Sequence, residues 1–340
     1  RAVCRSRRVG HLRPAARTLS LLATAFLCAG LALATLTGLL APVEPLADLI
    51  NHFRLHLIFA AGLSCLAATI MGGRWLTRIS IIVLLINLLL AAPAFYFVAP
   101  HAQADAQKIR ILSFNTGSRI DRSEQIEAML REQDADMALL LEVEPGEAAT
   151  LERLRDLYPY QVDCAQIHLC RLALLSKHEI VQADTHGREG LNPTYLTGEV
   201  MLAGSSVSIL GVHLTRPFLH SGQREELGFL ADRIEDTTGP MIMLGDFNLT
   251  PWSWEMSRLQ ARTGLLRHRT LGFSWPANRP PLFPQLLIDH ILTRGPVATI
   301  STYTGPDTGS DHLPFIADLT MSPPPSSAML KPRILEQFLF

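Results

Sequence analysis

Side chains that could bind a metal ion or a phosphate group follow several short apolar segments in this 340-residue chain. Each segment ends in Asn, Glu, His or Asp, and a sixth polar group precedes the last apolar run: Ile111–Asn115, Leu139–Glu142, Ile209–His213, Met241–Asn248, Leu287–His290 and Gly309–His312. If these segments are buried strands, their polar ends gather at one rim of the sheets. Carboxylate and amide oxygens are hard ligands suited to Mg²⁺, whereas no Cys/His cluster has zinc spacing. The pattern predicts a site for Mg²⁺, or alternatively Mn²⁺, and for phosphate.

Five signatures, taken in order, resemble the endonuclease/exonuclease/phosphatase superfamily, which has the DNase I-like fold. They are Ser113-Phe114-Asn115, Leu141-Glu142-Val143, Gly245-Asp246-Phe247-Asn248-Leu249-Thr250-Pro251-Trp252, Ile288-Asp289-His290 and Ser310-Asp311-His312-Leu313-Pro314. Each is weak alone, but their order between Lys108 and Thr320 makes the set specific. The resemblance implies a metal-dependent phosphoesterase. The substrate stays open, because a fold does not determine a substrate.

The resemblance also implies the metal ligands. Glu142 would be the main ligand, with Asn115 and Asp311 completing or supporting the site. Nuclease members often carry a further acid two residues after the first Asn, and this chain has Gly117 there. That departure puts a second metal position, and a nuclease activity, in doubt.

The resemblance implies catalytic roles for the remaining positions of the signatures. Asp246 and Asn248 would orient and deprotonate the attacking water and contact the phosphate. His312 would hydrogen-bond the scissile phosphate, and Asp289 would fix the tautomer of that imidazole. His213 would contact a phosphate oxygen. The metal would polarise the phosphoryl group, and no covalent enzyme intermediate is implied.

A few other side chains allow more than one interpretation. Arg171, Lys177 and Arg216 lie beside predicted strands, and each is a candidate for phosphate contact or for an ordinary surface position. His290 directly follows Asp289, so on a strand it faces the opposite way and is expected to pack in the interior. In the soluble part, Cys164 and Cys170 bracket a short loop, and a disulfide is chemically permitted there if the domain lies outside the cytoplasm.

The chain divides into a basic apolar part and an acidic polar part. Residues 1–104 contain nine Arg, no Lys and only two acids, a formal charge of +7, so the rest carries −8 of the total of −1. An acidic soluble part argues mildly against a protein that grips nucleic acid non-specifically. We expect domains at 1–104 (anchor) and 105–320 (catalytic), and a flexible tail at 321–340.

Three apolar stretches are near or above the length needed to cross a bilayer as helices. They are Leu19 to about Val43, Leu55 to about Gly73, and Ile79 to about Pro100, and none contains Lys, Arg, Asp or Glu. A cleavable signal peptide would explain only the first stretch. Arginines cluster before the first stretch and between the second and third, which predicts a cytoplasmic N-terminus and an extracytoplasmic catalytic domain, in a multi-pass inner membrane protein.

The soluble part alternates between short apolar runs and amphipathic stretches. Strands are predicted at Ile109–Phe114, Met137–Val143, Leu172–Ser176, Tyr195–Leu202, Val207–His213, Met241–Leu244, Ile288–Leu292, Ile300–Tyr303 and Phe315–Leu319. Helices are predicted at Arg122–Glu132, Ala148–Leu157, about Gly222 to Asp236 and about Ser253–Thr263. Two stacked sheets with flanking helices predict an α+β domain, a four-layer α/β/β/α sandwich, preceded by three transmembrane helices.

The anchor and the signatures together favour hydrolysis of a phosphorylated lipid at the outer face of a bacterial membrane. The layout is similar to membrane-bound bacterial members of the superfamily, including those linked to glycopeptide resistance. The apolar, proline-rich loop from Phe273 to Leu286 is either a packed connector or a lip that receives a lipid. The alternatives are an extracytoplasmic nuclease, with nucleic acid as substrate, and a degenerate binding domain. Nothing in the sequence indicates an obligate protein partner.

Overall fold

A computed structural model divides the chain into two compact units, Arg1–Ala94 and Phe95–Phe340. It describes residues 14–95, 106–117, 122–164, 170–190, 192–218, 222–268, 270, 272–280 and 284–321. The predicted flexible tail lies outside the described residues, apart from Met321 at its start. Each unit is treated below by itself.

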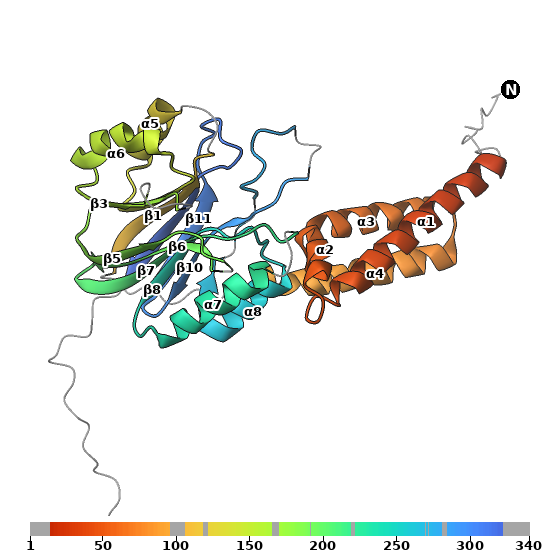
Figure 1. The fold of residues 1–340 in the computed structure, drawn as a ribbon. Coiled ribbons are helices and arrows are strands. Elements are labelled where there is room, and N and C mark those ends of the chain that lie inside the picture. Colours follow the sequence, from red (N-terminus) through yellow and green to blue (C-terminus); the bar gives the residue numbers. More distant parts are fainter. Residues whose placement is uncertain are drawn as a thin grey trace, which may run out of the picture. The chain divides into compact units, whose positions relative to one another are not determined.

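The first unit is helical, with α1 (Pro14–Gly38), η1 (Pro45–Ala47), α2 (Asp48–His52), α3 (Arg54–Ile70) and α4 (Arg74–Phe95) (Figure 1). Two helices, Ala16–Gly38 and Arg74–Phe95, are by themselves long and apolar enough to cross a membrane. The 17-residue α3 qualifies only together with Pro45–His52, from which it is bent by 61°. Against the three predicted transmembrane helices, the described residues therefore contain two candidate spans, or three if the bent pair forms one span.

A buried polar network links the helices of this unit. The Arg54 side chain, 2% exposed, donates to Asn51 and, at 2.7 Å, to Asn87 Oδ1. Asn51 in turn donates to Asp48 Oδ1 at 2.7 Å, and Asn87 donates to Thr35 Oγ1 at 2.8 Å. The sequence did not indicate this network, because Asp48 and Arg54 lie outside the apolar stretches. Polar groups in an apolar setting need partners, so the network fixes how these helices pack.

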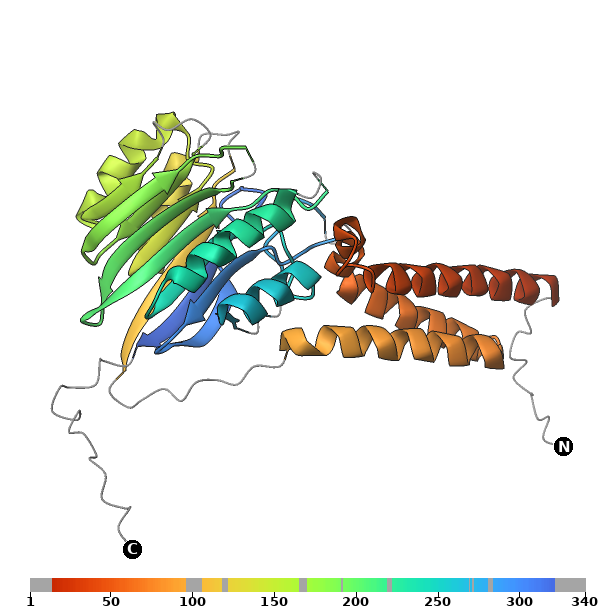
Figure 2. The same ribbon diagram turned by 60° about the horizontal axis from the view of Figure 1, so that its bottom comes forward.

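The second unit contains two six-stranded sheets. In order across sheet A lie β11 (Val297–Thr304), β12 (Phe315–Met321), β1 (Gln107–Asn115), β2 (Met137–Leu141), β4 (Leu172–Ser176) and β3 (Tyr160–Asp163). Sheet B contains β5 (Ile180–His186), β6 (Thr194–Leu202), β7 (Ser205–His213), β8 (Met241–Asp246), β10 (Asp289–Arg294) and β9 (Leu266–Arg267). The helices α5 (Ser123–Gln133) and α6 (Ala148–Arg153), the latter extended by η3 (Leu154–Asp156), lie outside one sheet, and α7 (Gly222–Asp236) and α8 (Trp254–Thr263) outside the other (Figures 1 and 2). The predicted four-layer sandwich is confirmed.

Alternation along the strands produces these layers. On β1, Ile109 and Ile111 belong to the apolar cluster between the two sheets, whereas Leu112 and Phe114 pack with Ile126 and the other apolar residues under α5 and α6. Successive side chains of a strand point to opposite faces, so both faces of β1 are buried. A strand buried on both faces has an almost continuous apolar sequence, and that sequence made β1 predictable.

Each sheet has a parallel pair of strands at its centre, and these pairs place the polar strand ends at one rim. In sheet A, β1 and β2 run parallel with Asn115 opposite Leu141, so Glu142 follows directly. In sheet B, β7 and β8 run parallel with His213 opposite Asp246, and antiparallel β10 places Asp289 opposite Asp246 as well. Parallel strands joined through α5 and α7 end at the same edge, so the predicted site residues gather there.

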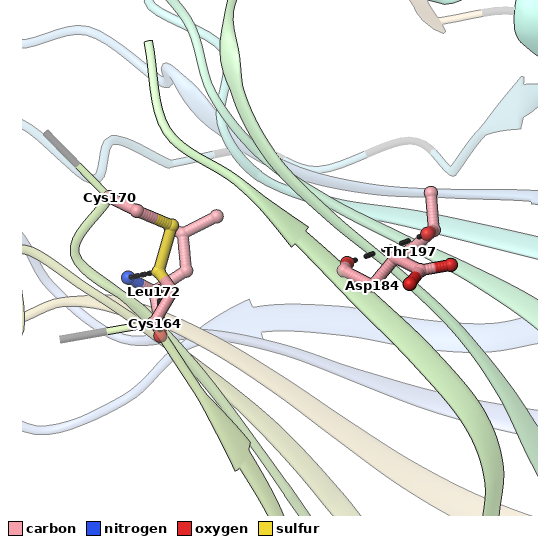
Figure 3. The surroundings of a disulfide bond; sticks show 5 residues. All are labelled: Cys164, Cys170, Leu172, Asp184 and Thr197. Carbon is pink, nitrogen blue, oxygen red and sulfur yellow. Dashed lines mark hydrogen bonds between the residues drawn. A yellow bond between two sulfur atoms is a disulfide. The ribbon is translucent and has the colours of Figure 1, made fainter. Parts of the chain in front are cut away.

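The sequence did not predict β3, β5 or β9. The first two are outer strands whose residues are mostly exposed or half-buried, so they lack the apolar runs that indicate a strand. Cys164 and Cys170 form a disulfide with a Cα–Cα distance of 5.5 Å, as the sequence permitted (Figure 3). The Cys164 backbone N–H donates to the Leu172 carbonyl at 3.1 Å, and the Leu172 N–H donates to Cys164 Sγ at 3.1 Å, which holds the disulfide at the start of β4.

Candidate active site

Two carboxylates, one from each sheet, converge on a shared amide at the rim. Asn115 Nδ2 donates to Glu142 Oε1 at 3.2 Å and to Asp246 Oδ2 at 3.3 Å. The Nε2 atom of His213 lies 3.9 Å and 3.7 Å from the same two oxygens. Carboxylates this close repel one another unless positive charge lies between them. The donor set therefore fits a hard divalent cation such as Mg²⁺.

The backbone at the rim adopts conformations that side chains usually avoid. Glu142 and Asn248 have φ values of 60° and 49°, in the left-handed region. Gly245 has φ 144°, and a Cβ there would lie 1.9 Å from the carbonyl oxygen of Val212. Strain of this kind persists where the surrounding fold holds it, and it is frequent at functional sites. Only glycine can precede Asp246, which explains one letter of the signature physically.

Asn248 is positioned by its neighbours rather than left as a mobile surface residue. Its backbone N–H donates to Asp246 Oδ1 at 2.9 Å, and its side-chain Nδ2 donates to the carbonyl oxygen of Leu214 at 2.9 Å. The side-chain oxygen of Asn248 is thereby turned away from Leu214 and stays available as an acceptor. Asp246 and Asn248 thus form a fixed acceptor pair at the end of β8, suited to orient a water molecule.

His312 and Asp289 form a buried dyad. Nδ1 of His312 lies 2.8 Å from Asp289 Oδ2, and its Nε2 lies 3.7 Å from Asp246 Oδ2. Burial lowers the pKa of His312, but the charges of Asp289 and Asp246 and the hydrogen bond to Asp289 outweigh it and raise the pKa to about 10. The imidazole is therefore a cation at neutral pH that can donate a hydrogen bond to a phosphate oxygen.

The pKa of Asp246 is raised above that of an ordinary surface carboxyl. Burial raises its pKa, and the charge of Asp289 raises it further, while the attraction of His312 and His213 opposes the rise. A raised pKa makes the carboxylate a better proton acceptor. This suits the predicted role of Asp246 in taking a proton from water.

Asp246, Asp289 and His312 could also hold a metal ion by distance alone, since their ligand atoms lie within 4.8 Å of one another. We assign this trio to proton and phosphate chemistry instead. Asp289 Oδ2 is engaged with His312 Nδ1 at 2.8 Å. The predicted cation position at Glu142, beside Asp246, is the second candidate.

The other two predicted ligands have supporting contacts. Asn115 Oδ1 accepts the backbone N–H of Gly117 at 3.1 Å, so its amide nitrogen, not its oxygen, faces the carboxylates. Asp311 Oδ2 accepts the indole N–H of Trp275 at 3.2 Å, and its carbonyl accepts from the backbone of Ala277 at 2.7 Å. In this arrangement Asn115 orients Glu142, and Asn115 could ligate through oxygen only if its amide turned.

The proline-rich loop from Phe273 supports the catalytic residues. The sequence did not predict this supporting role. Ser274 Oγ accepts the backbone N–H groups of Ile288 and Asp289 at 3.1 and 3.2 Å, and its carbonyl accepts from Leu313 at 2.8 Å. Ser310 Oγ bonds the Asn115 carbonyl at 2.9 Å and accepts from the His312 backbone at 3.1 Å. The described part of the loop is therefore at least in part a packed connector, and residues 281–283 lie outside the description. The position of this loop directly before Asp289 was the sequence feature that could have indicated its supporting role.

The four secondary candidates fall into distinct places. Lys177 follows β4 at the opposite rim, where it pairs with Asp134. Arg171 lies at the catalytic rim but pairs with Glu144 at 2.8 Å. Arg216 is exposed after β7. His290 is fully buried, with Nε2 2.8 Å from the Leu249 carbonyl, which agrees with the predicted packing role.

The arrangement can perform hydrolysis of a phosphate ester. Water held by Asp246 and Asn248 would pass a proton to the Asp246 carboxylate as its oxygen attacks phosphorus. His312 would donate from Nε2 to a phosphate oxygen, and Asp289 keeps the imidazole oriented for this. A divalent cation at Glu142 would neutralise charge on the phosphate.

Comparisons with known proteins identify a family match and a shared fold. The Endonuclease/Exonuclease/phosphatase family profile matches residues 112–312, the span from β1 to His312. An endonuclease/exonuclease/phosphatase from Bacteroides vulgatus superposes with a TM-score of 0.53 at 16% identity, covering 64% of this chain and 100% of that one. A truncated Caenorhabditis elegans TDP2 gives 0.51 at 18%, covering 63% and 98%, and a Beutenbergia cavernae family protein gives 0.51 at 20%, covering 64% and 72%. At these identities the likeness establishes the fold alone. No curated protein matches the sequence.

Proposed function

The chain belongs to the endonuclease/exonuclease/phosphatase family, and we propose that it is a metal-dependent phosphoesterase, anchored in a membrane, that hydrolyses a phosphate ester or pyrophosphate carried by a lipid. Members of this family are phosphoester hydrolases. One observation carries the proposal of activity: Glu142, Asn115 and Asp246 converge within hydrogen-bonding distance beside the buried His312–Asp289 dyad. A domain kept only for binding would have no need of this costly cluster of buried charges.

The lipid substrate is supported by the helical unit. Two of its helices are long and apolar enough to span a bilayer, so the catalytic unit is tethered near lipid head groups if they do. Arginines before the first apolar stretch favour a cytoplasmic N-terminus. With an odd number of spans the catalytic unit would then lie at the outer face, where genomic DNA is absent; with two spans it would lie in the cytoplasm.

The competing function is a nuclease. Gly117 stands where nuclease members often have an acid, and the soluble part is acidic, and both features favour a lipid phosphate over DNA. Neither excludes a phosphodiester from the rim, which makes the substrate a matter for direct assay.

A substrate panel tests the proposal. Full-length protein in detergent would be offered a polyprenyl pyrophosphate, a phosphatidylinositol phosphate, sphingomyelin and plasmid DNA, with Mg²⁺, with Mn²⁺ and with a chelator. We expect phosphate release from the prenyl pyrophosphate, abolished by the chelator and by His312→Ala. Plasmid nicking without lipid-phosphate release would replace the proposal with the nuclease. A reporter fused after Thr320 separately tests the side of the membrane, since activity only in the cytoplasm would overturn the outer-face position.

A further inference from the structure

Arg122, at the N-terminus of α5, places a guanidinium beside the catalytic rim. Its side chain lies against two glycines with positive φ. A methyl group built at Gly117 would lie 3.5 Å from Arg122 Nη1, and one built at Gly309 would lie 3.4 Å from Arg122 Nε. Gly117 and Gly309 have φ values of 71° and 86°. Because neither residue has a side chain, the guanidinium can pass between them.

The same glycine connects Arg122 with the signature that ends in His312. The methyl group built at Gly117 would also lie 3.3 Å from Asp311 Oδ1 and 3.1 Å from Ser310 Oγ. Arg122 and the predicted ligand Asp311 therefore both lie beside the Cβ position of Gly117. Nuclease members often carry an acid at this position, and here the Arg122 guanidinium lies next to it.

Arg122 is among the arginines of this unit whose charge is not paired with a carboxylate of the described residues. Among the described residues of this unit, nine arginines form ion pairs with carboxylates and Arg122, Arg216, Arg233 and Arg294 do not; the nine are Arg110, Arg131, Arg153, Arg155, Arg171, Arg188, Arg224, Arg258 and Arg262. Within the described part of the chain, no carboxylate lies within ion-pairing distance of Arg122. Arg122 Nη1 donates a long hydrogen bond, 3.4 Å, to the Thr116 carbonyl. A half-buried guanidinium next to a phosphate site retains the capacity to bind an anion.

We propose that Arg122 binds the second phosphate of a substrate with two adjacent phosphates, and so makes this site prefer a pyrophosphate bond to a phosphodiester. The proposal rests on the phosphoesterase function proposed above and names its substrate class. A phosphodiester carries a single negative charge on its phosphate, whereas a terminal pyrophosphate carries further charge on the neighbouring phosphate. Arg122, on the Asp311 side of the rim, supplies the positive charge that this additional group requires.

The reaction is hydrolysis of the pyrophosphate bond. The water oxygen bonds to the terminal phosphorus while the bond from that phosphorus to the bridging oxygen breaks. The proton of the water passes to Asp246 and from there to solvent. The bridging oxygen keeps the bonding electrons and leaves as part of the lipid monophosphate, whose charge Arg122 neutralises, and the terminal group departs as inorganic phosphate.

The test compares two substrates in matched variants of the full-length protein in detergent with Mg²⁺. For farnesyl pyrophosphate, we expect Arg122→Gln to lower kcat/KM about tenfold or more, the effect of losing a hydrogen bond between charged groups. For bis(4-nitrophenyl) phosphate, we expect a change of less than about threefold, because that substrate has no second phosphate. Arg122→Lys should lie between, since it keeps the charge and loses the planar fork. Lys177→Gln removes a cation from the opposite rim and should leave kcat/KM unchanged for both substrates.

Binding provides a readout that does not depend on turnover. Measured by calorimetry, the affinity for methylenediphosphonate should fall about tenfold in Arg122→Gln, and the affinity for inorganic phosphate should be unchanged. Equal losses with both substrates, or with both ligands, would assign Arg122 a purely structural role and overturn the proposal. A wild-type protein that prefers the diester would overturn it as well, while leaving the phosphoesterase function intact. If neither substrate is cleaved but the difference in binding persists, the phosphoesterase function fails and the anion site stands.

Discussion

Replacement of Asp289 by Asn tests how the dyad works. Asp289 is fully buried, and its Oδ2 lies 2.8 Å from His312 Nδ1. Asn keeps the shape but removes the charge that holds the imidazole protonated and oriented. A hydrogen bond to a charged group is worth about 1.5–3 kcal/mol, so we expect kcat to fall roughly ten- to 150-fold. The KM should change little, because Asp289 acts through His312 rather than on the substrate.

The assay is phosphate release by full-length Asp289→Asn in detergent with Mg²⁺, combined with thermal unfolding. The Tm should fall moderately, because Asn removes one partner of a buried charge pair, but the variant should remain folded at the assay temperature. Asp184→Asn, the same change on outer strand β5, serves as the control and should leave kcat unchanged. Activity of Asp289→Asn within about twofold of wild type would refute the dyad. A parallel collapse of Tm and activity would instead show that Asp289 acts on folding.

Three further predictions address the metal, the backbone and the buried histidine. Glu142→Gln should raise the Mg²⁺ concentration for half-maximal rate at least about tenfold; an unchanged titration curve would remove Glu142 from the metal site. Gly245→Ala should destabilise the protein by about 3 kcal/mol or more, because its methyl group would lie 1.9 Å from the Val212 carbonyl; a wild-type Tm would contradict the strained backbone. Burial, aided by the charge of Arg267, lowers the pKa of His290 to about 3. The unfolded chain then binds a proton that the folded chain does not, and the free energy of unfolding falls by up to about 1.4 kcal/mol per unit as pH drops from about 6.5 toward 3. His290→Gln should flatten this dependence in unfolding scans at pH 4.5 and 7, and an identical slope would be evidence against it.

The elements that sequence reasoning found are those with a strong local signal. The strands β1, β2, β7 and β8 are apolar along most of their length because both of their faces are buried. The helix predicted from about Gly222 to Asp236 agrees with α7. The strands that were missed, β3 and β5, are at outer positions with little apolar sequence. Buried strands have a recognisable apolar pattern in the sequence, whereas exposed edge strands do not.

The helical unit shows the limit of counting apolar residues. Composition identified three stretches, but it contains no information about a bend such as the 61° turn before α3. It also placed Arg54 in a loop, whereas Arg54 is buried and bonded to Asn87. Which polar groups find partners depends on how helices pack, and that is decided by contacts between residues distant in the chain.

By itself the sequence determined the reaction class of this protein and the residue types at its rim. Asn115, Glu142, Asp246 and His312 are local features of short signatures, since each follows or precedes a buried strand that its own neighbours specify. Only the tertiary structure decided how these residues act together. It paired His312 with Asp289, turned the Asn115 amide toward two carboxylates, placed Ser274 behind the dyad, and set Arg122 beside Gly117. These relations join residues from different strands, and interactions between distant segments depend on packing, register and backbone conformation that no short stretch of sequence contains.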